Sequence, residues 1–280
     1  MTLHSNDGYL LAAQPSERER LQLQSKVWEP AGRKLLAELE APAGARAIDL
    51  GCGCLGWLRL LSEWVGPEGR VVGTDVDASL LDHAADFCDD ENLANVRVLA
   101  DDMFDSHLPA ASFDLVHARF QIAPLGRASD ILDAMLRLVR PGGVLVLEDP
   151  CSGSWNTYPS VPAAQRLVQL IINAFDRSGG CFDAGTQNVQ LLRERGLDPY
   201  VRAEVLALPP GDPYLRLPVQ FGQSLRDRLS EEAGAEEVDA LLARADAELC
   251  APGVWGTTFT LIQTVARVAA EGDQEGGRWR

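Results

Sequence analysis

The chain has 280 residues, of which 46% are hydrophobic and 24% charged, an ordinary composition for a globular protein with a sizeable core. Its net charge of −16 argues against binding to nucleic acid or to an anionic membrane, because both need clustered lysine and arginine. The six cysteines form no CxxC pair and the four histidines show no ligand spacing against them, so we expect no metal site. We find neither a leader nor an apolar run of membrane-spanning length (about 18 residues), and therefore expect a cytoplasmic protein with reduced thiols.

The first predicted element is helical. Residues 16–40 have apolar positions at helical spacing, and Pro30 is expected to divide this segment into two helices.

From residue 46 the chain alternates between strand and helix patterns. Strands are predicted at residues 46–50, 69–76, 95–102, 113–119 and 144–149, and helices at 56–65, 78–93 and 128–139. This alternation predicts an α/β fold with a doubly wound, mostly parallel sheet. The carboxyl ends of the strands, where such sheets bind ligands, would then lie along one edge.

Beyond Pro150 the alternation stops. Helices are predicted at residues 161–175, 187–196 and 235–250, and two more strands at 200–210 and 257–269. Residues 271–280 have no apolar pattern and are expected to form a disordered tail.

Three glycines lie where the first predicted strand passes into the helix that follows, in the stretch from Asp49 to Gly56. Glycines at this place let the backbone approach a ligand closely, but a nearby carboxylate would repel a pyrophosphate. Here Asp49 stands at the mouth of the loop, and Asp75 and Asp101 end the next two strands. An acid at Asp75 can accept both hydroxyls of a ribose, and one at Asp101 can accept from an adenine amine. These acids indicate a neutral or cationic adenosine derivative without phosphate.

With these motifs the chain resembles the class I S-adenosylmethionine-dependent methyltransferases. The likeness covers residues 45–150 and includes "DLGCG", "GTDVD", "ADD" before "SFDLV", and "RLVRPGGVLVLED". In "ERERLQLQSKVWEPAG" and "LLRERGL" the chain resembles their small-molecule branch, which includes many natural-product tailoring enzymes. One departure is Leu55, which stands where many relatives carry a glycine, so that the third glycine falls at Gly56. The resemblance implies a Rossmann-like seven-stranded sheet with one antiparallel strand and a helical cap. It also implies S-adenosyl-L-methionine as cofactor and S-adenosyl-L-homocysteine as product.

The resemblance further assigns roles to single residues. Gly51 and Gly53 would flank the methionine part, Asp75 would bind the ribose, Asp101 the adenine amine, and the backbone N–H of Asp102 the adenine ring. The complete set of expected cofactor-binding residues is Asp49, Gly51, Gly53, Asp75, Val76, Asp101, Asp102, Met103, Ala118, Arg119 and Gln24.

Methyl transfer from a sulfonium is an in-line displacement, in which the protein mainly aligns the reactants and excludes water. Where the acceptor must lose a proton, a base helps. The candidates are His117, Glu148 and Tyr9, each with a structural role as the alternative. Aromatic residues in the loops after Pro150 suit a flat apolar acceptor, although a lid packed onto its own core would show the same pattern. The expected acceptor contacts are Tyr9, Trp155, Tyr158, Phe175, Phe221 and Trp255.

We therefore expect residues 1–44 to form an N-terminal helical cap, 45–150 the cofactor-binding core, and 151–270 the rest of the sheet with an acceptor-binding lid. The predicted activity is methylation of carbon, nitrogen or oxygen on a small-molecule acceptor, an aromatic or indole-like secondary metabolite. Two alternatives stay open. One is a protein that binds the cofactor but acts as a cyclase or binding module. The other, more remote, is an NAD-dependent oxidoreductase that uses "GCGCLG" as its dinucleotide loop. A homodimer that exchanges its N-terminal helices is also compatible with the sequence.

Overall fold

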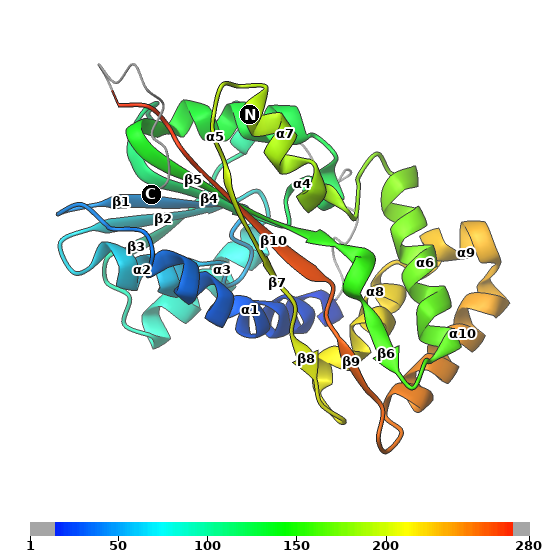
Figure 1. The fold of residues 1–280 in the computed structure, drawn as a ribbon. Helices are drawn as coiled ribbons and strands as arrows, with labels where there is room; N and C mark the ends of the chain where they lie inside the picture. Colours follow the sequence, from blue (N-terminus) through cyan, green and yellow to red (C-terminus); the bar gives the residue numbers. More distant parts are fainter. Residues whose placement is uncertain (1–14, 271–280) are drawn as a thin grey trace.

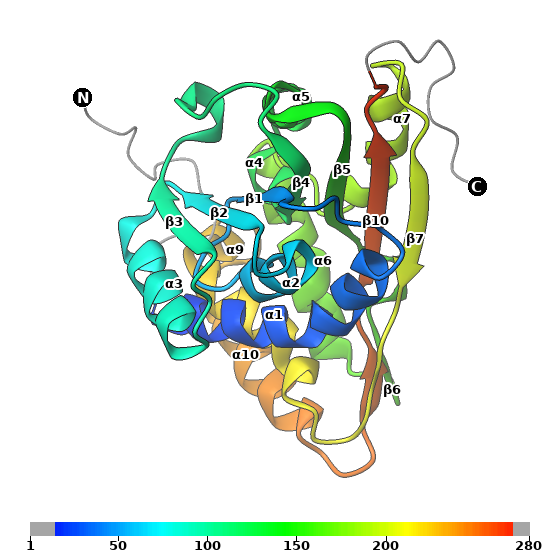
Figure 2. The ribbon, with the colours of Figure 1, turned by 90° about the vertical axis from the view of Figure 1, so that its left-hand side faces the viewer.

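The computed structural model describes the backbone of residues 15–270 and the side chains of residues 18–270. A seven-stranded sheet in the order β3-β2-β1-β4-β5-β10-β7 runs through the centre of the molecule (Figure 1). Figure 2 shows the same order from β3 on the left to β7 on the right. The strands are β1 Arg46–Leu50, β2 Arg70–Asp75, β3 Val96–Ala100, β4 Phe113–Arg119, β5 Val139–Cys151, β7 Tyr200–Glu204 and β10 Thr260–Arg267.

The five strands from β3 to β5 are parallel to their neighbours, and β10 runs antiparallel to both β5 and β7. This arrangement confirms the predicted mostly parallel seven-stranded sheet with one antiparallel strand.

Helices cover both faces of the sheet (Figure 1). One face carries α1 Pro15–Leu36, α2 Leu58–Val65 and α3 Ala78–Asp90, and the other α4 Ile122–Leu125, α5 Ala128–Leu138 and α7 Asn188–Arg193. Successive side chains of a strand point to opposite faces, so Ala47 and Ile48 of β1 belong to two different apolar clusters. Burial on both faces explains why the central strands β1, β4 and β5 are mostly apolar, whereas the edge strand β3 is only partly buried.

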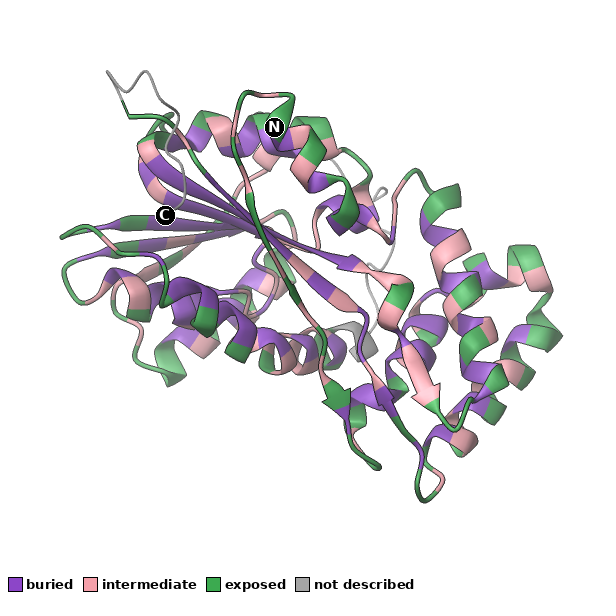
Figure 3. Cartoon of the chain, in the orientation of Figure 1, coloured by how far each residue is buried: buried purple, intermediate pink, exposed green. Residues whose placement is uncertain are grey.

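The remaining helices form a cap beyond the carboxyl ends of the parallel strands (Figures 1 and 3). They are α6 Pro162–Arg177, α8 Leu217–Ser224, α9 Arg226–Ala233 and α10 Ala235–Leu249, and their buried side chains join the core of one sheet face. Four short 3-10 helices connect these elements: η1 Met103–Asp105, η2 Ser152–Ser154, η3 Ala184–Thr186 and η4 Pro213–Arg216. Of the helices that the structure describes, none is both long and apolar enough to cross a membrane.

Two expectations about the elements are wrong. The helix α1 continues through Pro30, because the buried side chains of Trp28 and Leu35 hold both halves of it against the protein. The strands predicted at residues 200–210 and 257–269 each belong to two sheets. The first includes β8 Ala207–Leu208, and the second overlaps β9 Trp255–Thr257 at Thr257. In the second sheet, of order β6-β9-β8, β9 pairs with both β6 Asn156–Tyr158 and β8.

Candidate functional site

A cavity of about 740 Å³ lies at the carboxyl ends of the parallel strands, between the sheet and the cap. It is lined by the glycine loop after β1, by the ends of β2, β3 and β4, by one side of α1, and by phenylalanines of the cap. The predicted cofactor-binding residues that line it are Gln24, Asp49, Gly51, Gly53, Asp75, Val76, Asp101, Asp102, Met103 and Arg119. Ala118 is buried in β4 and does not reach the cavity.

Asp49 holds the glycine loop against the sheet. Its Oδ2 accepts a hydrogen bond of 2.6 Å from the backbone N–H of Trp57, and its Oδ1 lies 2.7 Å from Nδ1 of His117. Gly56 has a φ of +45°, and a Cβ on it would stand 2.1 Å from Oδ2 of Asp49, so only glycine fits there. Asp49 was expected to face a cationic ligand, but both of its oxygens already bind the protein. Its position therefore indicates that it holds the loop.

Asp75 at the end of β2 belongs to the same loop. Its Oδ2 accepts from the backbone N–H of Gly53 at 2.9 Å, and its Oδ1 accepts from that of Asp77 at 3.0 Å. Burial raises the pKa of this carboxyl group. A carboxylate oxygen can accept more than one hydrogen bond, so Asp75 retains capacity for the two hydroxyls of a ribose. The neighbouring Val76 is 42% exposed and offers an apolar surface to a flat ring.

Asp101 at the end of β3 has a buried oxygen that is not satisfied. Its Oδ1 accepts from the backbone N–H of His107 at 3.3 Å, whereas its Oδ2 has no hydrogen-bond partner among residues 18–270. Such an orphaned acceptor in a cavity wall fits a ligand that brings an N–H donor, such as an adenine amine. The side chain of Asp102 accepts from the backbone N–H of Phe104 at 2.9 Å and starts η1, whose Met103 also lines the cavity. The residues present thus fit an adenosine group.

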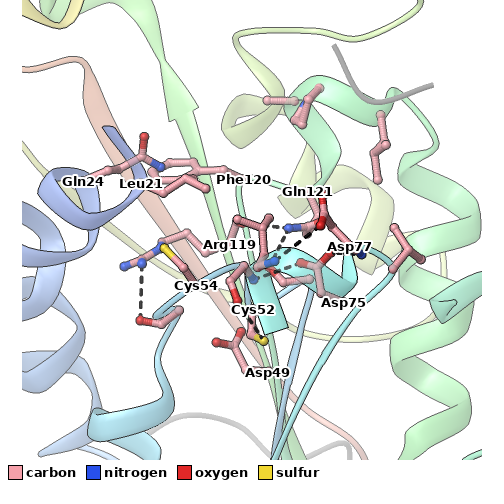
Figure 4. Close-up of a pocket in the computed structure, with 18 of the residues that line it drawn as sticks. Leu21, Gln24, Asp49, Cys52, Cys54, Asp75, Asp77, Arg119, Phe120 and Gln121 are labelled. Atoms are coloured by element: carbon pink, nitrogen blue, oxygen red, sulfur yellow. Dashed lines mark hydrogen bonds between the residues drawn. The ribbon is translucent and has the colours of Figure 1, made fainter. Parts of the chain in front are cut away.

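The end of β4 contributes three residues in succession (Figure 4). Arg119 donates from Nη2 to Oγ of Ser25 in α1 at 2.9 Å and so links the sheet to the N-terminal helix. Gln121 donates from Nε2 to the backbone oxygen of Gly51 at 3.0 Å, on the opposite side of the glycine loop. Phe120 between them has a φ of +56°, a strained conformation for a bulky residue. Sequence reasoning missed Phe120 and Gln121, and the pattern beyond the predicted strand holds no signal for either.

The two candidate bases in the sheet do not reach the cavity. His117 and Glu148 are fully buried, with Nε2 of His117 3.4 Å from Oε2 of Glu148, and the His117 ring stacks on Trp57 at 3.8 Å. Burial opposes a charged imidazole, but the carboxylates of Asp49 and Glu148 outweigh it and raise the pKa of His117. Glu148 also accepts from Nε2 of Gln263 at 2.7 Å. We therefore correct the expectation of direct proton transfer: this cluster lies behind the glycine loop and positions it.

Five phenylalanines form the wall of the cavity on the cap side. We call this group the aromatic lobe; its members are Phe120, Phe175, Phe182, Phe221 and Phe259. Their rings contact one another edge to face with centroids 5.4–6.4 Å apart. Phe175 and Phe221 were expected to contact the acceptor, and both lie in this wall.

Three other expected acceptor residues lie elsewhere. Trp155 stacks on the back of Phe182 at 5.4 Å and supports the lobe without lining the cavity. Tyr158 and Trp255 are 44% and 42% exposed and stack on each other at 4.6 Å, because β6 and β9 pair in the second sheet. The expectation that Tyr158 and Trp255 contact the acceptor is therefore wrong. Tyr9, which was also expected to contact it, lies outside the described residues.

No group of three His, Cys, Asp or Glu side chains within the described part of the chain is arranged to hold a metal ion. All six cysteines are free thiols, and Cys52 and Cys54 line the cavity. Burial raises the pKa of Cys52 well above its usual value, which keeps this thiol protonated and unreactive.

Comparison with known proteins agrees with this geometry. Residues 47–143 match the family described as a methyltransferase domain. A demethylmenaquinone methyltransferase of Staphylococcus carnosus is 26% identical over 147 residues, which are 52% of this chain and 56% of that protein. The chain thus spans about half the length of the curated relatives that it matches.

Solved structures share the fold at low sequence identity. The YcgJ protein of Bacillus subtilis superposes with a TM-score of 0.57 at 13% identity, covering 86% of this chain and 99% of that one. The [4+2]-cyclase SpnF superposes with a TM-score of 0.50 at 18% identity, covering 85% and 80%. Because a cyclase shares it, the fold alone does not decide which reaction the cavity supports.

Proposed function

Because residues 47–143 match the family described as a methyltransferase domain, we propose that this chain transfers a methyl group from S-adenosylmethionine to a flat, apolar small molecule. One observation supports the cofactor above all others. A glycine loop, the carboxylate of Asp75 and the unpaired Oδ2 of Asp101 border one cavity, at the ends of three adjacent strands.

Each part of the proposed cofactor finds a residue of matching chemistry. Asp75 would accept from the ribose hydroxyls, and Oδ2 of Asp101 from the adenine amine, while Val76 and Met103 would cover the ring. Arg119 would meet the methionine carboxylate near the glycine loop. The cofactor supplies an electrophilic methyl group, so that its S–CH₃ bond breaks as a bond to the acceptor forms and S-adenosylhomocysteine leaves.

The protein contributes alignment and exclusion of water. The buried cluster of His117, Asp49 and Glu148 fixes the glycine loop from behind, and the aromatic lobe faces it across the cavity. Rings at this position would hold a flat acceptor in line with the methyl group and keep water away. The shape and apolarity of the lobe favour an aromatic or indole-like secondary metabolite.

A labelled methyl group tests this proposal. The protein is incubated with S-adenosylmethionine that carries a deuterated methyl group and with a panel of naphthols, naphthoates, indoles and quinols, and products are analysed by mass spectrometry. We expect labelled product and S-adenosylhomocysteine from at least one panel member, and at least tenfold less with Asp75→Ala. The exposed Asp90, at the far end of α3, provides the control Asp90→Asn, which should keep the wild-type rate.

Two outcomes would contradict the proposal. If no member of the panel gains label, the acceptor is not a flat aromatic molecule. If a compound is converted without gaining label, the cavity performs other chemistry, such as the ring closure that stays open as the alternative.

A further inference from the structure

Phe120 has an unusual conformation at the end of β4. Its backbone φ of +56° is one that bulky residues rarely adopt, so the surrounding structure must hold it there. The backbone N–H of Phe120 donates to the backbone oxygen of Glu148 at 2.7 Å. Arg119 before it is bonded to α1, and Gln121 after it to Gly51 of the glycine loop. The residues on both sides are thus fixed, and Phe120 between them lines the cavity.

The ring of Phe120 connects the glycine loop with the aromatic lobe. It contacts the ring of Phe259 edge to face, with centroids 5.7 Å apart, and Cζ of Arg119 lies 5.8 Å from its centroid. In Figure 4, Phe120 and Asp49 lie on opposite sides of Cys52, a residue of the glycine loop. Phe120 therefore belongs to the cavity side of the loop, whereas Asp49 lies behind it.

The proposed binding mode brings the sulfonium of S-adenosylmethionine close to this ring. In that molecule the sulfur joins the ribose to the methionine chain. The ribose was assigned to Asp75 and the methionine carboxylate to Arg119, so the sulfur would lie between these two residues, over the glycine loop. Phe120 directly follows Arg119 and lines the same cavity. It is thus the member of the aromatic lobe that the sulfonium would meet first.

A positive sulfonium in a partly apolar cavity needs a group that stabilises its charge. Asp49, the carboxylate of the loop, does not supply one, because its two oxygens bind Trp57 and His117. The face of an aromatic ring carries negative charge density and attracts a cation, more strongly where water is excluded. The guanidinium of Arg119 is also near this ring, but the methionine carboxylate would neutralise its charge.

Building on the proposed function, we propose that the face of Phe120 binds the sulfonium of S-adenosylmethionine and distinguishes the cofactor from its product. During transfer the electron pair of the S–CH₃ bond stays on the sulfur, so the sulfur of S-adenosylhomocysteine is neutral. The product then keeps the contacts of its ribose and adenine but loses the cation–π contact. Phe120 thereby favours binding of the cofactor and release of the product.

Calorimetric titration of both nucleosides tests this selection through the ratio of their dissociation constants. The wild type should bind S-adenosylmethionine more tightly than S-adenosylhomocysteine by about threefold or more. Phe120→Leu keeps an apolar side chain and the same strained backbone but has no ring, and it should abolish this preference, whereas Phe120→Tyr should keep it. The control is Phe87→Leu, the same substitution in α3 at a residue that does not line the cavity, which should leave the ratio unchanged.

A purely structural role gives a different result. If Phe120 only filled space, Phe120→Leu would weaken both nucleosides equally and leave their ratio unchanged. That result would overturn the proposal, as would a wild type that binds both nucleosides equally or a Phe120→Tyr that loses the preference. Phe120→Met, which also lacks a ring, replaces Phe120→Leu if circular dichroism shows the latter to be unfolded, and the wild-type ratio needs no variant.

Failure of this inference is distinguishable from failure of the proposed function. Binding of both nucleosides without a preference that depends on Phe120 refutes only the role of its ring. Absence of binding by either nucleoside to the folded wild type refutes the proposed function itself.

Discussion

The buried cluster behind the glycine loop can be tested by replacing His117 with phenylalanine. The new ring fits the place of the imidazole, which stacks on Trp57 at 3.8 Å, but it cannot bind Asp49 or Glu148. The buried carboxylates of Asp49 and Glu148 then lack the imidazole that lies between them in the wild type. Removing one partner of a buried charged pair costs about 3–5 kcal/mol, and we expect a loss of this size in the free energy of unfolding at pH 7.

The variant should also alter the pH dependence of stability. The pKa of His117 is raised above the usual histidine value of 6.5 because the carboxylates of Asp49 and Glu148 outweigh burial. A raised histidine pKa adds stability that is complete below pH 6.5 and is lost as the pH rises through the folded-state pKa. The free energy of unfolding of the wild type should therefore fall as the pH rises through the pKa of folded His117, and that of His117→Phe should not.

Urea denaturation at intervals of one pH unit measures both effects, with the exposed His107 replaced by glutamine as control. Because Asp49 would lose one of its two hydrogen bonds, His117→Phe should also bind S-adenosylhomocysteine about tenfold more weakly. A variant that loses less than 1 kcal/mol at pH 7 and keeps its nucleoside affinity would refute the positioning role.

Three further changes test single contacts. Gly56→Ala should lower the free energy of unfolding by about 2 kcal/mol or more, since its Cβ would meet Asp49, whereas Gly153→Ala, with open space around it, should change it little; equal effects contradict the geometry of the loop. Burial raises the pKa of Asp149 to about 7, so the wild type should lose about 2 kcal/mol between pH 5 and pH 7 relative to Asp149→Asn, and parallel pH profiles would count against this. Phe120→Gly should be about 1 kcal/mol more stable than Phe120→Ala because glycine relieves the positive φ; denaturation that finds no difference contradicts the strain.

Much of the fold follows from periodicity along the chain. The central parallel strands β1, β4 and β5 are buried on both faces and mostly apolar, and amphipathic helices separate most of the strands along the chain. The second sheet was missed because β7 and β8, like β9 and β10, follow each other closely and form single strand-like runs in the sequence. Only the pairing of β6 with β9, between residues about a hundred positions apart, separates them.

For the cavity, the sequence predicts which residues lie at the strand ends that border it, but not how deeply each of their side chains is buried. The acids at strand ends line the cavity because parallel strands end along the same edge. His117 has the sequence position of a cavity residue, yet its ring lies between Asp49 and Glu148 and is fully buried. The exposure of Trp255 likewise depends on a tertiary pairing that local sequence does not encode. Phe120 lies in the cavity wall because its backbone is in the left-handed conformation. A glycine or asparagine at this position would have indicated that conformation in the sequence, whereas a phenylalanine does not.

Calorimetric titration with S-adenosylmethionine and S-adenosylhomocysteine, on the wild type, Asp75→Ala and Asp90→Asn, tests the central claim most directly. We predict micromolar binding that Asp75→Ala weakens at least tenfold, about 1.4 kcal/mol, and that Asp90→Asn leaves unchanged. Absence of binding to the folded wild type, or equal binding by Asp75→Ala, would contradict the assignment of this cavity to an adenosine cofactor.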